Sequence, residues 1–322
     1  MPHAHPSSAP FSSVESMPWA DIQAMQLQRL QAQLAYLADR SALYQRKLAD
    51  AKIAATDIRS LDDLQRIPMT TKQELRDSLQ AAPLLGLHQA ADWRDIVQVQ
   101  ASSGTTGSPA YVGLTQTDQV NWSEMTARGL YACGIRPHDT VLHAFSMSKG
   151  FVGGIPIWQG VSRIGAVDIP VGADGGVDRL LIAARDAHPR CIVGTPNFLL
   201  YLAQVAPTLI GRSATSLGVE RLVVGGEPGG GIPAIREGLQ QHWGAMCCEV
   251  MGGTDLGCVY WAEAEDQRGM YLVAPDHVLA ELIDPVSGLE VPPGQEGIVV
   301  HCDLANYNAV TTILTEDVGV AA

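Results

Sequence analysis

Hydroxyl residues and glycines crowd into one short stretch of the sequence, S-S-G-T-T-G at residues 102–107. Glycine lets a backbone approach a ligand closely, and successive N–H groups in a tight turn can form a nest for an anion. The segments 95–100 and 110–115 on either side are extended in character. We therefore predict a phosphate-binding loop between two strands, against the plainer alternative of a flexible hairpin loop. The predicted phosphate-binding residues are Ser102, Ser103, Gly104, Thr105, Thr106 and Gly107.

The order of these residues resembles the phosphate-binding signature of adenylate-forming enzymes, the superfamily of acyl- and aryl-CoA ligases. Three upstream segments resemble the phenylacetate-CoA ligase group: Y-Q-R-K at 44–47, S-L-D-D-L at 60–64 and I-P-M-T-T-K at 67–72. The likeness runs from about Trp19 to Asp317. It implies an AMP-forming ligase that uses ATP and Mg²⁺ to convert a carboxylic acid, which we expect to be aromatic, into acyl-AMP. The implied acceptor is CoA or the phosphopantetheine thiol of an acyl carrier protein.

Two further clusters receive nucleotide roles from this resemblance. The segment V-V-G-G-E-P at 223–228 is similar to the family segment that lies against adenine, which implies adenine contacts from Gly226, Glu227 and Pro228. The segment T-E-D at 315–317 is similar to a Thr-Gly-Asp whose Asp accepts both ribose hydroxyls, which implies that role for Asp317. Glu316 stands where the family has the glycine.

The segment M-G-G-T-D at 251–255 stands in the place of the family's Tyr-Gly-x-Thr-Glu. The resemblance implies that Thr254 donates to the α-phosphate and that Asp255 helps to hold Mg²⁺, so we expect both to be catalytic, with Gly252 also at the nucleotide. Asp255 is one methylene shorter than Glu, so its metal contact would pass through water, which Mg²⁺ readily retains. Met251 would pack against adenine in place of an aromatic ring. The alternative is a plain glycine-rich turn.

The acid pocket is also assigned by resemblance. Aromatic walls and glycines suit a flat ring, although each of these residues taken singly could equally belong to the core. The expected pocket residues are Phe145, Phe151, Gly153, Gly154, Pro196, Asn197, Phe198 and Gly225.

A rival interpretation concerns the glycine run that follows Pro228. Residues 229–234, G-G-G-I-P-A, formally fit the G-x-G-x-x-A pattern of dinucleotide-binding proteins, with Glu249 about 20 residues further on. The Glu-Pro pair between the preceding strand and the glycines spoils the tight turn that this motif needs. We therefore favour the adenine interpretation over a nicotinamide-dependent oxidoreductase.

Composition limits the partners. The 322 residues carry a net charge of −13, with 21 basic residues against 34 acidic ones, which argues against nucleic acid. No apolar run approaches the ~20 residues of a membrane span, and the N-terminus lacks a signal-peptide core. Six cysteines without CxxC spacing indicate reduced thiols in a cytoplasmic protein, and no convincing zinc ligand set is present, so we predict no zinc. A homodimer is a candidate assembly.

The order of elements predicts an α/β fold, with largely parallel sheets flanked by helices. Helices are expected at 19–49, 72–75 onward, 118–130, 150–164, 178–187, 198–206 and 232–243, and strands between them. From residue 269 consecutive strands at 270–273, 278–283 and 297–302 predict a small antiparallel β-rich subdomain, 269–322. We expect residues 1–16 to be disordered and 17–322 to form the large N-terminal domain of the family.

The family likeness also implies a C-terminal lid domain whose lysine assists adenylation. The sequence ends five residues after Asp317 and has no lysine after Lys149, so we expect this chain to lack the lid and to react slowly. The altered positions 251, 255 and 316 support an alternative function, an accessory or binding protein of the same fold with weakened catalysis that acts with an acyl carrier protein or a biosynthetic complex.

Overall fold

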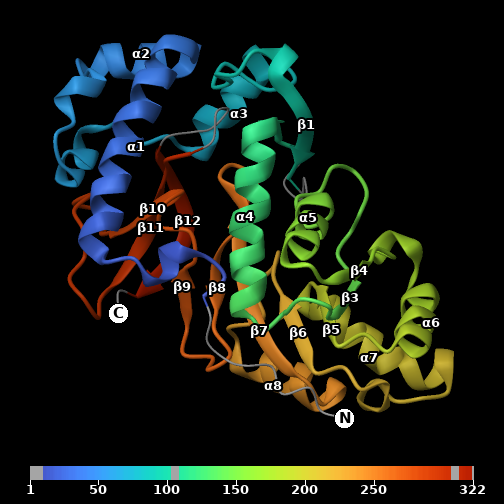
Figure 1. Ribbon diagram of the computed structural model, residues 1–322. Coiled ribbons are helices and arrows are strands. Elements are labelled where there is room, and N and C mark those ends of the chain that lie inside the picture. The colour runs from blue at the N-terminus through green and yellow to red at the C-terminus, as the bar shows by residue number, and fades with distance from the viewer. Residues whose placement is uncertain (1–9, 103–108, 306–311, 321–322) are drawn as a thin grey trace.

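The structure is a computed structural model that describes residues 10–102, 109–305 and 312–320, without the side chains of 312–319. The central feature is a seven-stranded sheet with the order β4-β3-β5-β6-β7-β8-β9 (Figure 1). β3, β4, β5, β6 and β7 run parallel, whereas β8 and β9 are antiparallel to their neighbours. The strands are β3 (Thr140–His143), β4 (Val167–Ile169), β5 (Cys191–Gly194), β6 (Arg221–Val224), β7 (Met246–Gly253), β8 (Gly257–Glu263) and β9 (Met270–Leu272).

Two smaller sheets flank this one. β1 (Ile96–Ala101) and β2 (Tyr111–Thr115) form an antiparallel pair at the two segments that the sequence predicted to be extended. β10 (Val278–Ile283), β11 (Glu296–Asp303) and β12 (Thr312–Val320) form a three-stranded antiparallel sheet. The mixed α/β fold with a small antiparallel sheet near the C-terminus is therefore confirmed.

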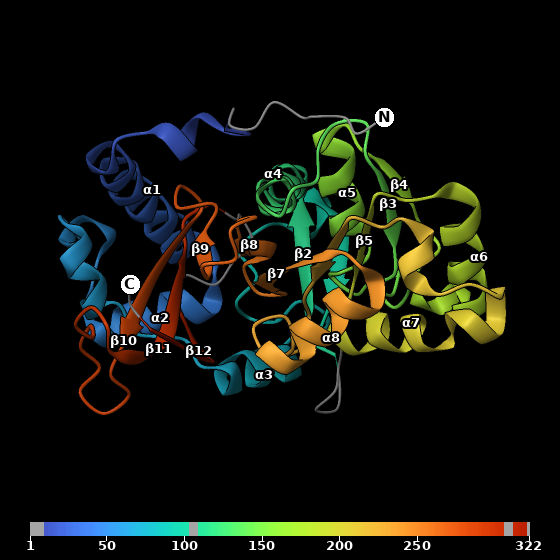
Figure 2. The same cartoon turned by 90° about the horizontal axis from the view of Figure 1, so that it is seen from below.

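Helices cover both faces of the central sheet, because its parallel strands are buried on both sides. On one face α4 (Gln116–Ala132) and α5 (Ile155–Ile164) pack Trp122, Met125 and Ile157 into a core with Val141 and Val193. On the other face lie α6 (Val177–Ala187), α7 (Pro196–Ile210) and α8 (Pro233–Trp243), with a separate core (Figure 2). The N-terminal helices α1 (Trp19–Arg40), α2 (Ala42–Ala51) and α3 (Lys72–Ala81) lie beside the three-stranded sheet.

Capping chemistry decides where two of these helices begin. The Thr71 hydroxyl accepts from the Glu74 N–H, and the Glu74 carboxylate accepts from the Thr71 N–H, which starts α3. The same reciprocal pair, Thr115 with Asp118, starts α4. The start of α4 therefore lies two residues before the expected helix at 118–130, at the residue that follows the Thr115 cap.

The structure differs from the expected elements in four places. The single helix at 19–49 is interrupted at Ser41, whose hydroxyl caps α2. α5 begins only at Ile155, so 150–154 form a turn ahead of it. β9 pairs with β8 and not with the small sheet, because Trp261 lies opposite Leu272. Within the segment expected to be disordered, residues 13–16 form a short 3₁₀ helix with a capping box and a buried Val14; residues 1–9 lie outside the described part.

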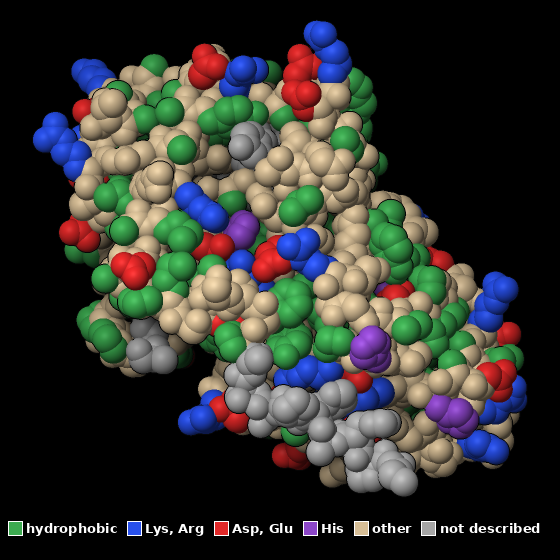
Figure 3. All heavy atoms as spheres, in the orientation of Figure 1, with side chains coloured by type: hydrophobic (Ala, Val, Ile, Leu, Met, Phe, Trp, Pro, Cys, Tyr) green, Lys and Arg blue, Asp and Glu red, His purple; other side chains and the backbone are tan. Residues whose placement is uncertain are grey.

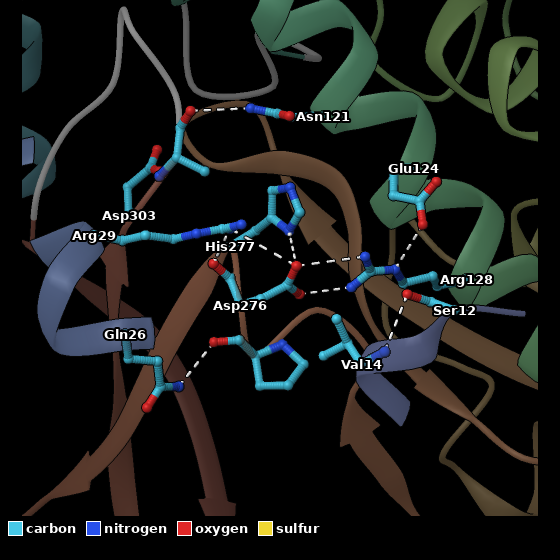
Figure 4. A network of polar contacts seen from close by, with 12 residues as sticks. Ser12, Val14, Gln26, Arg29, Asn121, Glu124, Arg128, Asp276, His277 and Asp303 are labelled. Atoms are coloured by element: carbon cyan, nitrogen blue, oxygen red, sulfur yellow. Dashed lines mark hydrogen bonds and ion pairs between the residues drawn. The ribbon is translucent and has the colours of Figure 1, made fainter. Parts of the chain in front are cut away.

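A network of charges joins the N-terminal helices to the loop before β10 (Figure 4). The Asp276 carboxylate accepts from Arg128 of α4 at 2.6 and 3.4 Å, and Arg29 of α1 lies 3.7 Å from it. Nδ1 of His277 lies 3.0 Å from the same carboxylate, and Glu124 accepts from Arg128 Nε at 3.0 Å. On the face shown in Figure 3, acidic, basic and histidine side chains gather between α1 and α4.

Candidate nucleotide and acid site

The carboxyl ends of the parallel strands carry most of the predicted site residues, and open α/β sheets bind their ligands at this edge. β3 ends at His143, two residues before Phe145. β5 ends at Gly194, just before Pro196, and β6 ends at Val224, just before the 225–228 segment. β7 ends at Gly253, and the turn 254–256 leads into β8. Segments far apart in the sequence therefore meet at one edge of the sheet.

Two phenylalanines and a glycine pack together at this edge. The rings of Phe145 and Phe151 have centroids 6.5 Å apart and are tilted by 52°. A Cβ on Gly153 would lie 2.5 Å from Cε1 of Phe151 and 3.2 Å from Cγ of Phe145, and a Cβ on Gly154 would lie 2.8 Å from the Ser146 carbonyl oxygen. The turn therefore needs glycine at both positions, because any side chain there would push against the rings or the backbone.

The segment 225–228 lies next to the rings of Phe145 and Phe151. Gly225 lies against β7, so that a Cβ there would be 2.5 Å from the Val250 carbonyl oxygen. Gly226 has φ +81, a conformation that favours glycine, and its Cβ position is 3.8 Å from Phe145 and 3.9 Å from Phe151. The Asn197 N–H donates to Glu227 Oε1 at 2.9 Å, which ties the start of α7 to this segment. The predicted adenine segment and the predicted acid pocket are thus neighbours.

The acidic turn follows β7 directly. Met251 pairs with Trp261 across β7 and β8, and the register shifts between Met251 and Gly253. A Cβ on Gly252 would lie 1.8 Å from the Cys258 carbonyl oxygen, so the irregularity requires glycine. Thr254 and Asp255 lie in the turn itself, and both are half-buried.

Burial and the charge of Lys72 both act on the Asp255 carboxyl. Burial raises the pKa of its carboxyl above the ordinary value, and the positive charge of Lys72 acts in the opposite direction. Burial, together with the charge of the same lysine, lowers the pKa of His301 to about 4, so this histidine is neutral near pH 7. Lys72 is exposed and stands at the start of α3. The sequence motif I-P-M-T-T-K contains Lys72, but its place at the start of a capped helix is the only signal in the sequence for a role at the site.

Ser102 is the described end of the predicted phosphate loop; residues 103–107 lie outside the described part. Its backbone N–H donates to Ala110 O and its hydroxyl accepts from the Ala110 N–H, both at 2.9 Å, which closes the base of the loop. The preceding residue, Ala101, donates to Gly150 O at 2.7 Å, and Cys258 Sγ donates to Val152 O at 3.0 Å. The 150–154 turn therefore connects the base of the phosphate loop to the strand after the acidic turn.

In the glycine run of the rival dinucleotide hypothesis, backbone N–H groups already bind a side chain of the protein itself. The Glu249 carboxylate accepts hydrogen bonds from the backbone of Gly230 and Gly231, and burial, followed by the charge of Glu263, raises the pKa of Glu249. Glu263 in turn accepts from Arg236 Nη2 at 2.7 and 2.8 Å. The N–H groups that would hold a pyrophosphate thus bind an internal carboxylate, which argues against the oxidoreductase hypothesis.

Some predicted residues lie elsewhere or outside the description. Phe198 packs against the core under α6, α7 and α8, on the opposite face of the sheet from the Phe145 cluster. Asp317 lies in β12, but its side chain is outside the described residues. Within the described part of the chain, no three His, Cys, Asp or Glu side chains gather as a metal site would require. Asp255 could therefore bind Mg²⁺ only as a single carboxylate ligand, with phosphates and water as the other ligands of the ion.

Among the described residues, no helix combines the length and the apolar character that a membrane crossing requires.

Comparisons with known proteins agree with this geometry. A family model described as "AMP-binding enzyme" matches residues 23–301. The chain is 32% identical over 292 residues to a phenylacetate-coenzyme A ligase of Thermus thermophilus, and 30% identical over 292 residues to that of Escherichia coli. These alignments cover 90% of this chain but 63% and 65% of the two relatives, so the chain spans less than two thirds of their length. A crystal structure of 2-hydroxyisobutyryl-CoA ligase with 2-HIB-AMP and CoA matches at a TM-score of 0.88 and 28% identity, over 94% of this chain and 64% of that one. The chain therefore belongs to the AMP-binding enzyme family.

Proposed function

We propose that this protein activates a small carboxylic acid as its acyl-AMP with ATP, and that CoA or a phosphopantetheine thiol then accepts the acyl group. The observation that carries the proposal is the meeting of three predicted segments at one sheet edge: the turn 150–154, the segment 225–228 and the acidic turn 251–255. The relatives named as CoA ligases support the same chemistry.

In this proposal each segment has its own task. Phe145 and Phe151 hold the apolar part of the acid and exclude water from it. The backbone at Gly226 and Glu227 lies against the base, and Thr254 donates to the phosphate that the acid carboxylate attacks. Lys72 adds positive charge beside Asp255, where negative charge accumulates on the departing pyrophosphate. A bound Mg²⁺ would supply further positive charge to the phosphates, and Asp255 is the residue that would hold it.

The phenylalanine pair favours an aromatic acid, because offset or tilted rings pack well against a flat ring. The likeness to a 2-hydroxyisobutyryl-CoA ligase makes a small hydroxy acid the second candidate. Acid-dependent exchange of labelled pyrophosphate into ATP, with phenylacetate, benzoate and 2-hydroxyisobutyrate compared at equal concentration, separates the two. Faster exchange with either aryl acid supports the aromatic assignment, whereas exchange with 2-hydroxyisobutyrate alone contradicts it.

The second candidate function is an accessory protein of the same fold with weakened catalysis, which acts with an acyl carrier protein or a biosynthetic complex. The raised pKa of Asp255 favours it, because a carboxyl that resists ionisation binds a cation less well. Calorimetry separates the functions: ATP binding that tightens with Mg²⁺, together with pyrophosphate exchange, supports the ligase, and acid binding without exchange supports the accessory protein.

A further inference from the structure

A buried histidine and aspartate lie beneath the turn that borders the proposed acid pocket. His143 ends β3, and Asp168 is the middle residue of the neighbouring parallel strand β4. Their side chains are 0% and 2% exposed, and Nδ1 of His143 lies 3.3 Å from Oδ1 of Asp168. Both strands lie beside α5 (Figure 2). Neither residue belongs to any of the motifs that the sequence offered.

The second ring nitrogen of His143 points at the pocket turn. Nε2 lies 2.9 Å from the Gly153 carbonyl oxygen, and because a carbonyl can only accept, Nε2 carries the hydrogen and donates it. Nδ1 is then the nitrogen that faces Asp168, and one further proton lies between Nδ1 and Oδ1, because a bare ring nitrogen and a carboxylate oxygen can both only accept. The other carboxyl oxygen, Oδ2, is buried and has no hydrogen-bond partner among the described residues. The pair is therefore directed at one backbone atom, the Gly153 oxygen.

The position of the Gly153 backbone affects the positions of both aromatic rings. A Cβ added at Gly153 would lie 2.5 Å from Phe151 and 3.2 Å from Phe145, so this backbone runs close to both rings and leaves no room for a side chain between them. The Phe145 ring also stands edge-on to the His143 ring, with centroids 6.2 Å apart. In such close packing, a displacement of the Gly153 backbone is passed on to the neighbouring rings.

A second carboxylate holds the other half of the same loop. Asp174 Oδ2 accepts from the Ser146 hydroxyl at 2.7 Å and from the backbone N–H groups of Met147 at 3.0 Å and Ser148 at 3.2 Å. These contacts are exposed, whereas the His143 contact is buried. The loop is thus clamped on its outer side by Asp174 and on its inner side by His143.

We propose that His143, oriented by Asp168, is a positioning residue that fixes Gly153 and thereby sets the space between Phe145 and Phe151 for the flat part of the acid. The inference rests on the proposed function for the identity of the pocket. His143 acts through the Gly153 backbone and touches neither nucleotide nor reacting atoms.

The test compares His143→Leu with His143→Gln by calorimetry with phenylacetate or benzoate, whichever the wild type binds better, and separately with ATP. Leu removes the donor and leaves the Gly153 oxygen unpaired, and we expect acid affinity to fall about tenfold while ATP affinity changes less than about twofold. The Gln side-chain amide can donate from near the position of Nε2, and we expect it to restore acid affinity to within about threefold of the wild type. The matched control is His88→Leu. His88 is also buried, and its Nδ1 bonds Ser78 at 2.9 Å away from the pocket, so this change should lower Tm without changing acid affinity.

Each outcome of these measurements supports or overturns the positioning role of His143. If the wild type binds an acid and His143→Leu binds it equally well, the positioning role is overturned while the proposed function stands. If the wild type binds none of the acids, the proposed function fails and the inference with it. If His143→Leu does not fold, Asp168→Asn decides, because it changes only the group behind the ring: acid binding weakened about threefold with ATP binding unchanged supports the role, and unchanged acid binding overturns it.

Discussion

The charge network around Asp276 offers a prediction whose size can be worked from the structure. Asp276→Asn removes the carboxylate that pairs with Arg128, a guanidinium that is 5% exposed. Removing one partner of a buried ion pair costs about 3–5 kcal/mol, because the other charge stays buried and uncompensated. Arg128 keeps Glu124 at 3.0 Å, so we expect the lower end, about 3 kcal/mol. Urea denaturation at pH 7 measures this as a lower midpoint.

The pH dependence of the same variant gives a second check. Burial alone would raise the pKa of Asp276, but the hydrogen bonds and charges of His277 and Arg128 outweigh it and hold the pKa well below its ordinary value. A carboxyl whose folded pKa is depressed stabilises the protein above its unfolded pKa of about 4, and this stabilisation is lost as pH falls further. The difference between the wild type and Asp276→Asn should therefore be full at pH 7 and shrink below about pH 4.

An exposed pair supplies the control. Arg185 and Asp186 lie 2.7 Å apart on α6 with side chains 40% and 60% exposed, and Asp186→Asn should leave the urea midpoint unchanged. In a double-mutant cycle, replacing Asp276 and Arg128 together by Leu and Met should cost much less than the sum of the single changes. Additive costs, or a loss under about 1 kcal/mol for Asp276→Asn, would refute the assignment of a buried, coupled pair.

Three further predictions follow from single contacts. Burial, reinforced by two neighbouring carboxylates, raises the pKa of Glu281 to about 7, so its negative charge destabilises the fold as pH rises from about 4.5 to 7. Glu281→Gln should therefore be more stable than the wild type by about 2 kcal/mol at pH 8 and equal to it near pH 4, by urea denaturation; this value allows for partial exposure. Gly252→Ala places a Cβ against Cys258 O and should weaken ATP binding at least about tenfold in calorimetry, and unchanged binding would exclude the turn from the nucleotide site. Lys72→Met should raise KM for ATP several-fold and leave KM for the acid unchanged, because it removes the positive charge beside Asp255; an unchanged KM for ATP would count against this role.

The sequence predicted most of the strands and the order of the site segments, for physical reasons. Parallel strands are short apolar runs, and their carboxyl ends must share an edge, so motifs that follow strands must converge. At glycines 153, 225, 226 and 252 the neighbouring backbone or aromatic rings leave little or no room for a side chain. The presence of glycine at these positions therefore helped to locate the site segments in the sequence.

Contacts between distant positions could not be predicted. His143 of β3 contacts Asp168 of β4, and the Glu249 carboxylate accepts hydrogen bonds from the backbone of Gly230 and Gly231. No local sequence pattern predicts either contact. β9 was placed in the wrong sheet because a strand of three residues has no pattern of its own, and its register is decided by pairing with β8. Trp261 of β8 donates to His301 of β11 at 2.9 Å, a link between two sheets that only the tertiary fold creates.

Acid-dependent exchange of pyrophosphate into ATP, measured in the wild type and in Asp255→Ala, tests the central claim most directly. We expect exchange that requires both an acid and Mg²⁺ and that falls about a hundredfold in the variant, because the phosphates lose the carboxylate that holds their cation. Exchange that persists unchanged without Asp255, or no exchange with any acid of the panel in the presence of ATP and Mg²⁺, would contradict it.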